Sequence, residues 1–178
     1  MKVTVADCLE LQAFKDSEVV GGRLGLSNDV KSVSVLDAGK IEDLDFYGGN
    51  NSEILLTGFL GFRDDVAKQC SFVRSVAKKG CAALAVYYVG KGISELDAEV
   101  AAVADEAALP LILMPGNAEY NETIAEIMDK VLYGDNFRNS LISNTVFHLL
   151  NFEKHSNFQS AVREAAINNE FQLIILSE

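Results

Sequence analysis

The stretch Glu53-Ile54-Leu55-Leu56-Thr57 decides the fold, because its apolar run is typical of a central strand in a parallel sheet, buried on both faces. Two similar runs follow it, CAALAVYY at 81–88 and LILM at 111–114. Between the runs, apolar residues recur every three or four positions, which predicts helices from Phe62 to Lys78 and from Ile93 to Ala107. This alternation predicts an α/β fold, a mainly parallel sheet flanked by helices.

Towards the N-terminus the pattern adds one strand and one short helix. The β-branched run over 30–36 predicts the first strand of the sheet. A helix is expected over 3–11, capped by the Thr4 hydroxyl and favoured by the charge of Asp7 at its amino end. The glycines between 21 and 25 are interpreted as a turn that precedes the first strand.

Towards the C-terminus the pattern becomes helical. Apolar spacing predicts one helix over 120–131 and another from Phe137 to Leu150, the second acting as a connector. The chain closes on the apolar run 171–178, which we interpret as a strand. Because few domains finish on an uncovered apolar strand, we expect the chain to be truncated inside a longer protein.

Composition excludes several classes of protein. The chain has 178 residues, 49% of them hydrophobic, and a formal net charge of −11. A surface that binds nucleic acid needs clustered Lys and Arg, so DNA contact by this chain alone is not expected. No uninterrupted apolar run reaches about 18 residues, and no signal peptide precedes the acidic Asp7, so we expect a cytoplasmic protein with no membrane partner.

Motifs for metals, cofactors and nucleophilic catalysis are missing from the sequence. The three cysteines have no CxxC spacing and are interpreted as reduced, semi-buried thiols. His148 and His155 lie seven residues apart without further ligands at zinc spacing, so no metal is expected. Gly90-Lys91-Gly92 does not fit a phosphate-binding P-loop, and the 21–25 segment does not fit a dinucleotide fingerprint. We therefore expect no catalytic residue and no cofactor.

The best candidate for a ligand site is the segment that follows the strand at 53–57. Open α/β sheets bind ligands at the carboxyl ends of their strands, where Thr57 offers a hydroxyl and Gly58 permits close approach of the backbone. The same rule selects Asp37, the pair at 87–88 and the pair at 115–116. We expect Asp37, Thr57 and Gly58 to bind the ligand. Simple turn chemistry explains the Thr57 segment as well, so that alternative stays open.

Several segments, taken in order, resemble the N-terminal domain of the purine catabolism regulator (PucR-like) family of bacterial transcription factors. The similarity covers about residues 1–130. It rests on five segments: VTVADCLEL with the later VVGG, NDVKSVSVLD (28–37), NSEILLTG (51–58), KKGCAALAV (78–86) and ADEAALPLILMP (104–115).

The resemblance implies a regulatory module and not an enzyme. It implies a regulatory domain at 1–130, a helical connector at 131–155 and the truncated start of a second regulatory region at 156–178. A small-molecule effector would bind the first domain of a homodimer. DNA would be bound by a helix-turn-helix absent from this chain.

Two alternatives remain open. One is a dimerisation scaffold without a ligand, with the helix from Phe137 as its main interface. The other is a hydrolase or lyase acting through the carboxylates of Asp37, Glu42, Asp43 and Asp45. No nucleophile–base pair in the sequence supports such an enzyme.

Overall fold

The computed structural model of the chain describes residues 2–37, 51–91 and 95–132. The chain divides into two units, Met1–Leu132 and Tyr133–Glu178. The helix predicted from Phe137 and the strand predicted at 171–178 lie outside the described residues. The domain limits at 130 and 155 therefore stay predictions.

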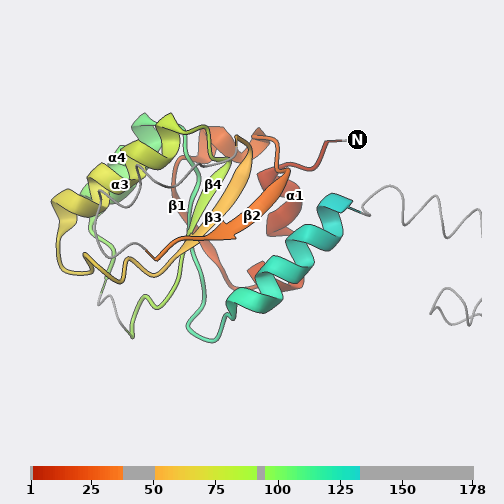
Figure 1. Ribbon diagram of the computed structural model, residues 1–178. Coiled ribbons are helices and arrows are strands. Elements are labelled where there is room, and N and C mark those ends of the chain that lie inside the picture. The colour runs from red at the N-terminus through yellow and green to blue at the C-terminus, as the bar shows by residue number, and fades with distance from the viewer. Residues whose placement is uncertain (1, 38–50, 92–94, 133–178) are drawn as a thin grey trace, which may run out of the picture. The chain divides into compact units, whose positions relative to one another are not determined.

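One sheet organises the described part of the chain (Figure 1). Its five strands run in the order β1-β5-β4-β3-β2, and β2, β3, β4 and β5 pair in parallel. The bounds are β1 (Glu18–Gly21), β2 (Ser32–Val35), β3 (Glu53–Thr57), β4 (Ala83–Val86) and β5 (Leu111–Leu113). The predicted α/β fold with a mainly parallel sheet is confirmed.

The strand β1 was not predicted, and it is the antiparallel member of the sheet. It pairs with β5 at the edge, Glu18 opposite Leu113, and its register shifts between Val19 and Gly21. A strand of four residues that ends on glycine is too short for an alternation of apolar and polar residues to be recognised in the sequence. Of the glycines predicted to form a turn, Gly21 ends β1, Gly22 joins the strand to the 3-10 helix η2 (Arg23–Ser27), and Gly25 lies within η2.

Helices cover both faces of the sheet (Figure 1). On one face lie α3 (Val66–Lys78) and α4 (Ala98–Glu106). On the other lie α1 (Val5–Leu9) and a helix over 120–132, drawn in teal. A 3-10 helix, η1 (Gln12–Phe14), follows α1. Successive β3 residues enter opposite cores, Leu55 beside α3 and Leu56 beside α1, which explains why all five β3 residues are buried.

The caps show which helix ends were predictable. Thr4 caps α1 as predicted: the Asp7 amide donates to Thr4 Oγ1 at 3.2 Å, and the Thr4 amide donates to the Asp7 carboxylate at 2.8 Å. The helix expected from Phe62 begins at Val66, after the cap Asp65. The helix expected from Ile93 begins later, at Ala98, where the carboxylate of its cap Asp97 accepts the Glu99 amide proton.

All three cysteines of the chain lie in the described part, as free thiols. Cys8, Cys70 and Cys81 are buried and unpaired, and burial raises the pKa of Cys8 and of Cys81 to about 12. Within the described ranges, no helix is long and apolar enough to cross a bilayer. The same ranges contain no group of three or more His, Cys, Asp or Glu side chains placed to hold a metal ion.

Gly22 fixes the edge strand β1 against the rest of the fold. Its backbone is left-handed, with φ at 68°, and its amide donates to Asp105 Oδ1 at 2.6 Å. A Cβ atom at this position would lie 1.9 Å from the carbonyl oxygen of Leu109. The turn therefore needs glycine for two separate reasons, the positive φ and the close approach of backbone.

We predict that Gly22→Ala lowers the free energy of unfolding by about 2–5 kcal/mol, because left-handed strain and a backbone clash add. Gly90→Ala is the matched control: φ is 81° there, but no atom lies within 4 Å of the added Cβ. The control should cost only about 1–2 kcal/mol. Urea unfolding of both variants measures the difference, and equal losses would contradict the role given to the Leu109 contact.

Candidate functional site

The carboxyl ends of β2, β3 and β4 meet, and there Asp37 binds the end of the neighbouring strand. Asp37 follows β2, and its Oδ1 accepts a hydrogen bond from the Gly58 amide at 2.5 Å. The Thr57 hydroxyl lies 3.5 Å from the same oxygen, a weak contact. The structure thus brings together the three residues predicted to bind a ligand. Ligand binding by them stays a prediction.

Thr57 and Gly58 are both enclosed by protein. The Thr57 side chain is buried, and its Oγ1 accepts a hydrogen bond from the Phe59 amide at 3.2 Å. A Cβ at Gly58 would lie 2.8 Å from Cδ2 of Tyr88, so the Tyr88 ring covers this glycine closely. The contacts of Thr57 and Gly58 therefore hold the end of β3 against the segments that follow β2 and β4.

Sequence reasoning missed Tyr120, which completes the group. Its hydroxyl donates to the second carboxylate oxygen of Asp37, Oδ2, at 3.1 Å. Its ring centroid lies 4.3 Å from that of Tyr87 and 5.9 Å from that of Tyr88. Tyr120 reads in the sequence as one apolar position of an amphipathic helix, which hides its polar contact. We call Asp37, Thr57, Gly58, Tyr88 and Tyr120 the Asp37 cluster.

The phenols of this region keep their protons well above neutral pH. Burial, followed by the negative charge of Asp37, raises the pKa of Tyr120 above its usual value near 10. Burial raises the pKa of Tyr87 to about 12, and its hydroxyl donates to Thr123 Oγ1 at 2.6 Å. Both groups therefore act as neutral hydrogen-bond donors.

The predicted pair at 115–116 follows β5, which is the neighbour of β4 in the sheet. The carbonyl of Gly116 accepts a hydrogen bond from Lys91 Nζ at 2.6 Å, and the Lys91 amide donates to the carbonyl of Tyr88 at 3.1 Å, so Lys91 links this pair to the Asp37 cluster. Glu42, Asp43 and Asp45 lie outside the described residues, as do His148 and His155.

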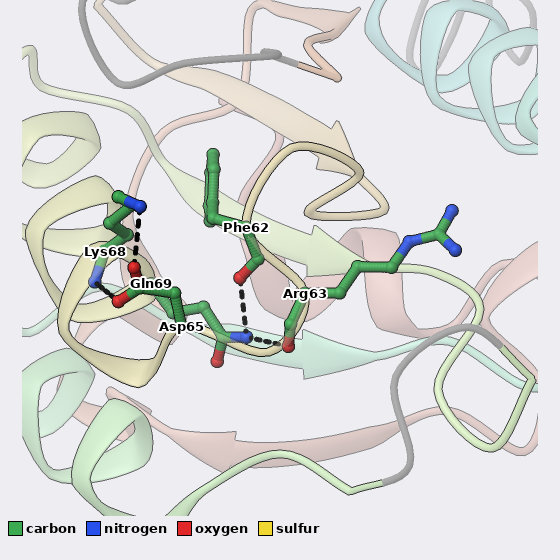
Figure 2. Close-up of polar contacts among 5 residues, drawn as sticks. All are labelled: Phe62, Arg63, Asp65, Lys68 and Gln69. Atoms are coloured by element: carbon green, nitrogen blue, oxygen red, sulfur yellow. Dashed lines mark hydrogen bonds and ion pairs between the residues drawn. The ribbon is translucent and has the colours of Figure 1, made fainter.

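The loop over 58–65, between β3 and α3, is held at both of its ends. Asp37 holds Gly58, and at the other end Gln69 Nε2 donates to the carbonyls of Phe62 at 3.2 Å and Arg63 at 2.6 Å (Figure 2). Gln69 is itself buried. Phe59 lies between these attachments, buried among aromatic rings. Hydrogen bonds therefore attach both ends of the loop to the rest of the fold.

A groove of about 450 Å³ opens beyond this loop, between the amino ends of α3 and α4. It falls within the range of small-molecule sites. Arg63 contributes a positive charge, and its buried Nε has no hydrogen-bond partner in the described structure. Its side chain extends away from Lys68 and Gln69 (Figure 2). We call this feature the helix-start groove, and it is lined by Arg63, Asp64, Val66, Gln69, Glu95, Leu96, Asp97 and Ala98.

Sequence reasoning missed the groove for a topological reason. Ligand crevices in α/β sheets form where neighbouring crossovers leave to opposite faces. Here α3 and α4 follow β3 and β4 over the same face, so the rule does not predict an opening between them. The groove forms instead where the two helices begin side by side. Its charged residues lie in the loops before the helices, where the sequence has no regular spacing of apolar residues that would reveal them.

Comparisons with known proteins agree over most of the described unit. The sequence profile of the "Purine catabolism regulatory protein-like family" matches residues 7–131, which is more than half of the chain. The "Purine catabolism regulatory protein" of Bacillus subtilis (strain 168) is 21% identical over 180 aligned residues, covering 99% of this chain. The chain spans about a third of that relative, 32% of its length.

We predict that Asp37→Ala lowers the free energy of unfolding by about 1–3 kcal/mol, because it leaves the Gly58 amide and the Tyr120 hydroxyl without their acceptor. Asp37→Asn should cost less than about 1 kcal/mol, since the amide oxygen can accept from Gly58 and the amide group can donate to Tyr120. Urea unfolding at neutral pH compares them. Equal losses for the two variants would contradict this account, because Asn would then not replace the lost hydrogen bonds.

We also predict that stability falls as the pH rises above about 10. The unfolded chain releases its tyrosine protons near pH 10, whereas folded Tyr87 and Tyr120 hold theirs to higher pH, so deprotonation favours unfolding. Buried Cys8 and Cys81 add a similar loss between about pH 9 and 12. Tyr120→Phe should therefore show a shallower decline than the wild type in urea unfolding between pH 9.5 and 11.5 under reducing conditions. An unchanged slope would contradict the raised pKa.

Proposed function

Because the chain belongs to the purine catabolism regulatory protein-like family, we propose that it is a regulatory domain of a transcription regulator that binds a small-molecule effector. The effector site that we propose is the helix-start groove, at the carboxyl edge of the sheet. Asp37, Thr57 and Gly58 then support the site by holding the loop over 58–65, which forms one wall of the groove.

The observation that carries this proposal is a groove of about 450 Å³, one wall of which is a loop held at both ends by hydrogen bonds. A loop held at both ends loses little conformational entropy when a ligand binds, so more of the contact energy remains as affinity. The loop is held by the Asp37–Gly58 hydrogen bond and by the two hydrogen bonds from Gln69.

The charges of the groove indicate the chemistry of the effector. Asp64 and Glu95 are exposed carboxylates at its rim, and Asp97 adds a third that also caps α4. Arg63 adds one positive charge. Carboxylates accept hydrogen bonds, so this lining favours a small polar compound with several N–H or O–H donors and at least one acceptor for the guanidinium group.

The DNA-binding step of such a regulator would belong to other parts of a longer protein. The net charge of −11 disfavours contact between this chain and DNA. The relative from Bacillus subtilis is about three times as long as the aligned segment, which leaves room for further domains. Dimerisation stays a prediction, because the helix from Phe137 lies outside the described residues.

The structure offers less support for the alternatives. A hydrolase or lyase would need a free carboxylate as its base, and both oxygens of Asp37 are engaged by protein donors. A scaffold without a ligand would leave the fixed loop and the groove without a use. That alternative is tested by the same experiment as the effector.

The experiment is a thermal-shift screen of the chain against purine breakdown products, amino acids, sugar acids and inorganic phosphate. A ligand at 100 times its Kd stabilises a protein by about 2.7 kcal/mol, which should raise Tm by roughly 5–10 °C. We expect a polar hit whose affinity Arg63→Gln and Glu95→Gln weaken by about tenfold or more.

Arg74→Gln on α3 and Glu106→Gln at the end of α4 are the matched controls. Both residues are exposed and neither lines the groove, so the affinity should stay unchanged. A hit that is indifferent to the groove variants would place the site elsewhere. No hit, together with a stable dimer in analytical ultracentrifugation, would favour the scaffold.

A further inference from the structure

We propose that the hydrogen bond between Tyr120 and Asp37 is a latch that couples the carboxyl edge of the sheet to the helix over 120–132. The inference rests on the proposed function only for its use, because an effector that displaces the edge would release the first turn of this helix.

The first turn of the helix is attached to strand ends. Tyr120 is its first residue. The ring of Tyr120 packs at a tilt against that of Tyr87, with the two centroids 4.3 Å apart, and its hydroxyl donates to Asp37 Oδ2 at 3.1 Å. One turn later, buried Thr123 accepts the hydroxyl proton of Tyr87 at 2.6 Å. The helix start is thus bound to residues that follow β2 and β4, and these attachments join segments far apart in the sequence.

The side chain of Asp37 makes both of the hydrogen bonds that form the latch. One oxygen holds the Gly58 amide at the end of β3, and the other holds the Tyr120 hydroxyl at the start of the helix. Any shift of the Gly58 backbone moves the carboxylate, and a shift of the carboxylate weakens the bond to Tyr120. Tyr88 adds to the connection, because its ring lies against Gly58 and edge-on to the ring of Tyr120.

The backbone on this edge is strained. Phe59 has φ at 52° and Tyr88 has φ at 63°, in the left-handed region that costs a side-chain-bearing residue about 1–2 kcal/mol. These two residues flank the covered Gly58 from the ends of β3 and β4. Stored strain of this size is comparable to one hydrogen bond, so a second arrangement of the edge lies within reach of ligand binding.

Attachments further along the helix are independent of the latch. Glu126 accepts a hydrogen bond from the Ala13 amide at 2.9 Å, and Ile127 is buried in the core. Release of Tyr120 therefore frees the first turn while the later turns stay docked. The device predicted here is a local change at the start of the helix and not the unfolding of the domain.

Hydrogen–deuterium exchange of the full 178-residue chain tests the latch without an effector. In Asp37→Ala, we expect exchange of the Thr123 amide, which donates to the Glu119 carbonyl at 3.2 Å in the first turn, to rise about fivefold, the effect of one net hydrogen bond. In Tyr120→Phe, exchange at Gly58 should rise by a similar factor, because coupling between two sites is reciprocal. The double variant should show little further increase, since each change opens the same latch.

Two controls separate the latch from a general loss of stability. Tyr88→Phe keeps the ring that packs on Gly58 and Tyr120 and removes a hydroxyl that makes no hydrogen bond to the described residues, so exchange in the helix should not change. Amides of α3, on the opposite face of the sheet, should exchange as in the wild type. Asp37→Asn, which keeps an acceptor for Gly58 and a partner for Tyr120, should restore wild-type exchange.

An unchanged first turn in Asp37→Ala would overturn the proposal, and so would an equal rise in the helix and in α3. If Asp37→Ala does not fold, Tyr120→Phe alone decides through the exchange at Gly58. The result is independent of the effector screen. If the screen gives no hit but exchange in the helix responds to Asp37→Ala, the effector proposal fails and the latch stands. If the screen gives a polar hit but exchange in the helix does not respond, the latch fails and the effector proposal stands.

Discussion

The parallel pairing of β3 between β2 and β4 is the constraint on which the described part of the protein depends. Val33 lies opposite Ile54, and Ile54 lies opposite Ala83, so three strands run in register and finish together. Each buried Leu or Ile of β3 contributes about 1.5–3 kcal/mol through removal of apolar surface from water. If β3 slipped by one residue along its neighbours, each of its side chains would point into the core on the opposite face of the sheet. The burial of these side chains therefore also fixes the register of the strands.

That register has a chemical consequence at the edge of the sheet. The segments that follow β2, β3 and β4 leave the sheet close to one another. There the carboxylate of Asp37 accepts hydrogen bonds from two donors, the Gly58 amide and the Tyr120 hydroxyl. Uncapped strand ends would leave backbone amides without acceptors, which is costly in a partly buried site. The same edge is therefore closed around Asp37 and open at the helix-start groove, where two capped helices begin.

The sequence predicts features that depend on near neighbours. The periods of β3 and α3 reflect which faces are buried, and the cap of α1 depends on Thr4 and Asp7, three residues apart. Tyr120 and Asp37 are separated by 83 residues, and no local pattern links them. The loop over 58–65 reads as the start of a helix, because its phenylalanines continue the spacing of α3. Their burial comes from packing on each other, which a period cannot reveal.

The strand order also sets the sequence of events during synthesis on the ribosome. β2, β3, β4 and β5 each pair with the strand that precedes or follows them in the chain, so they can assemble as they emerge. β1 emerges before them, yet within the described residues it pairs with β5 alone, and the pair joins Glu18 to Leu113. The N-terminal strand must therefore wait, unpaired, until almost the whole unit has been made. Its shortness and its exposed Glu18 limit pairing with other chains during that interval.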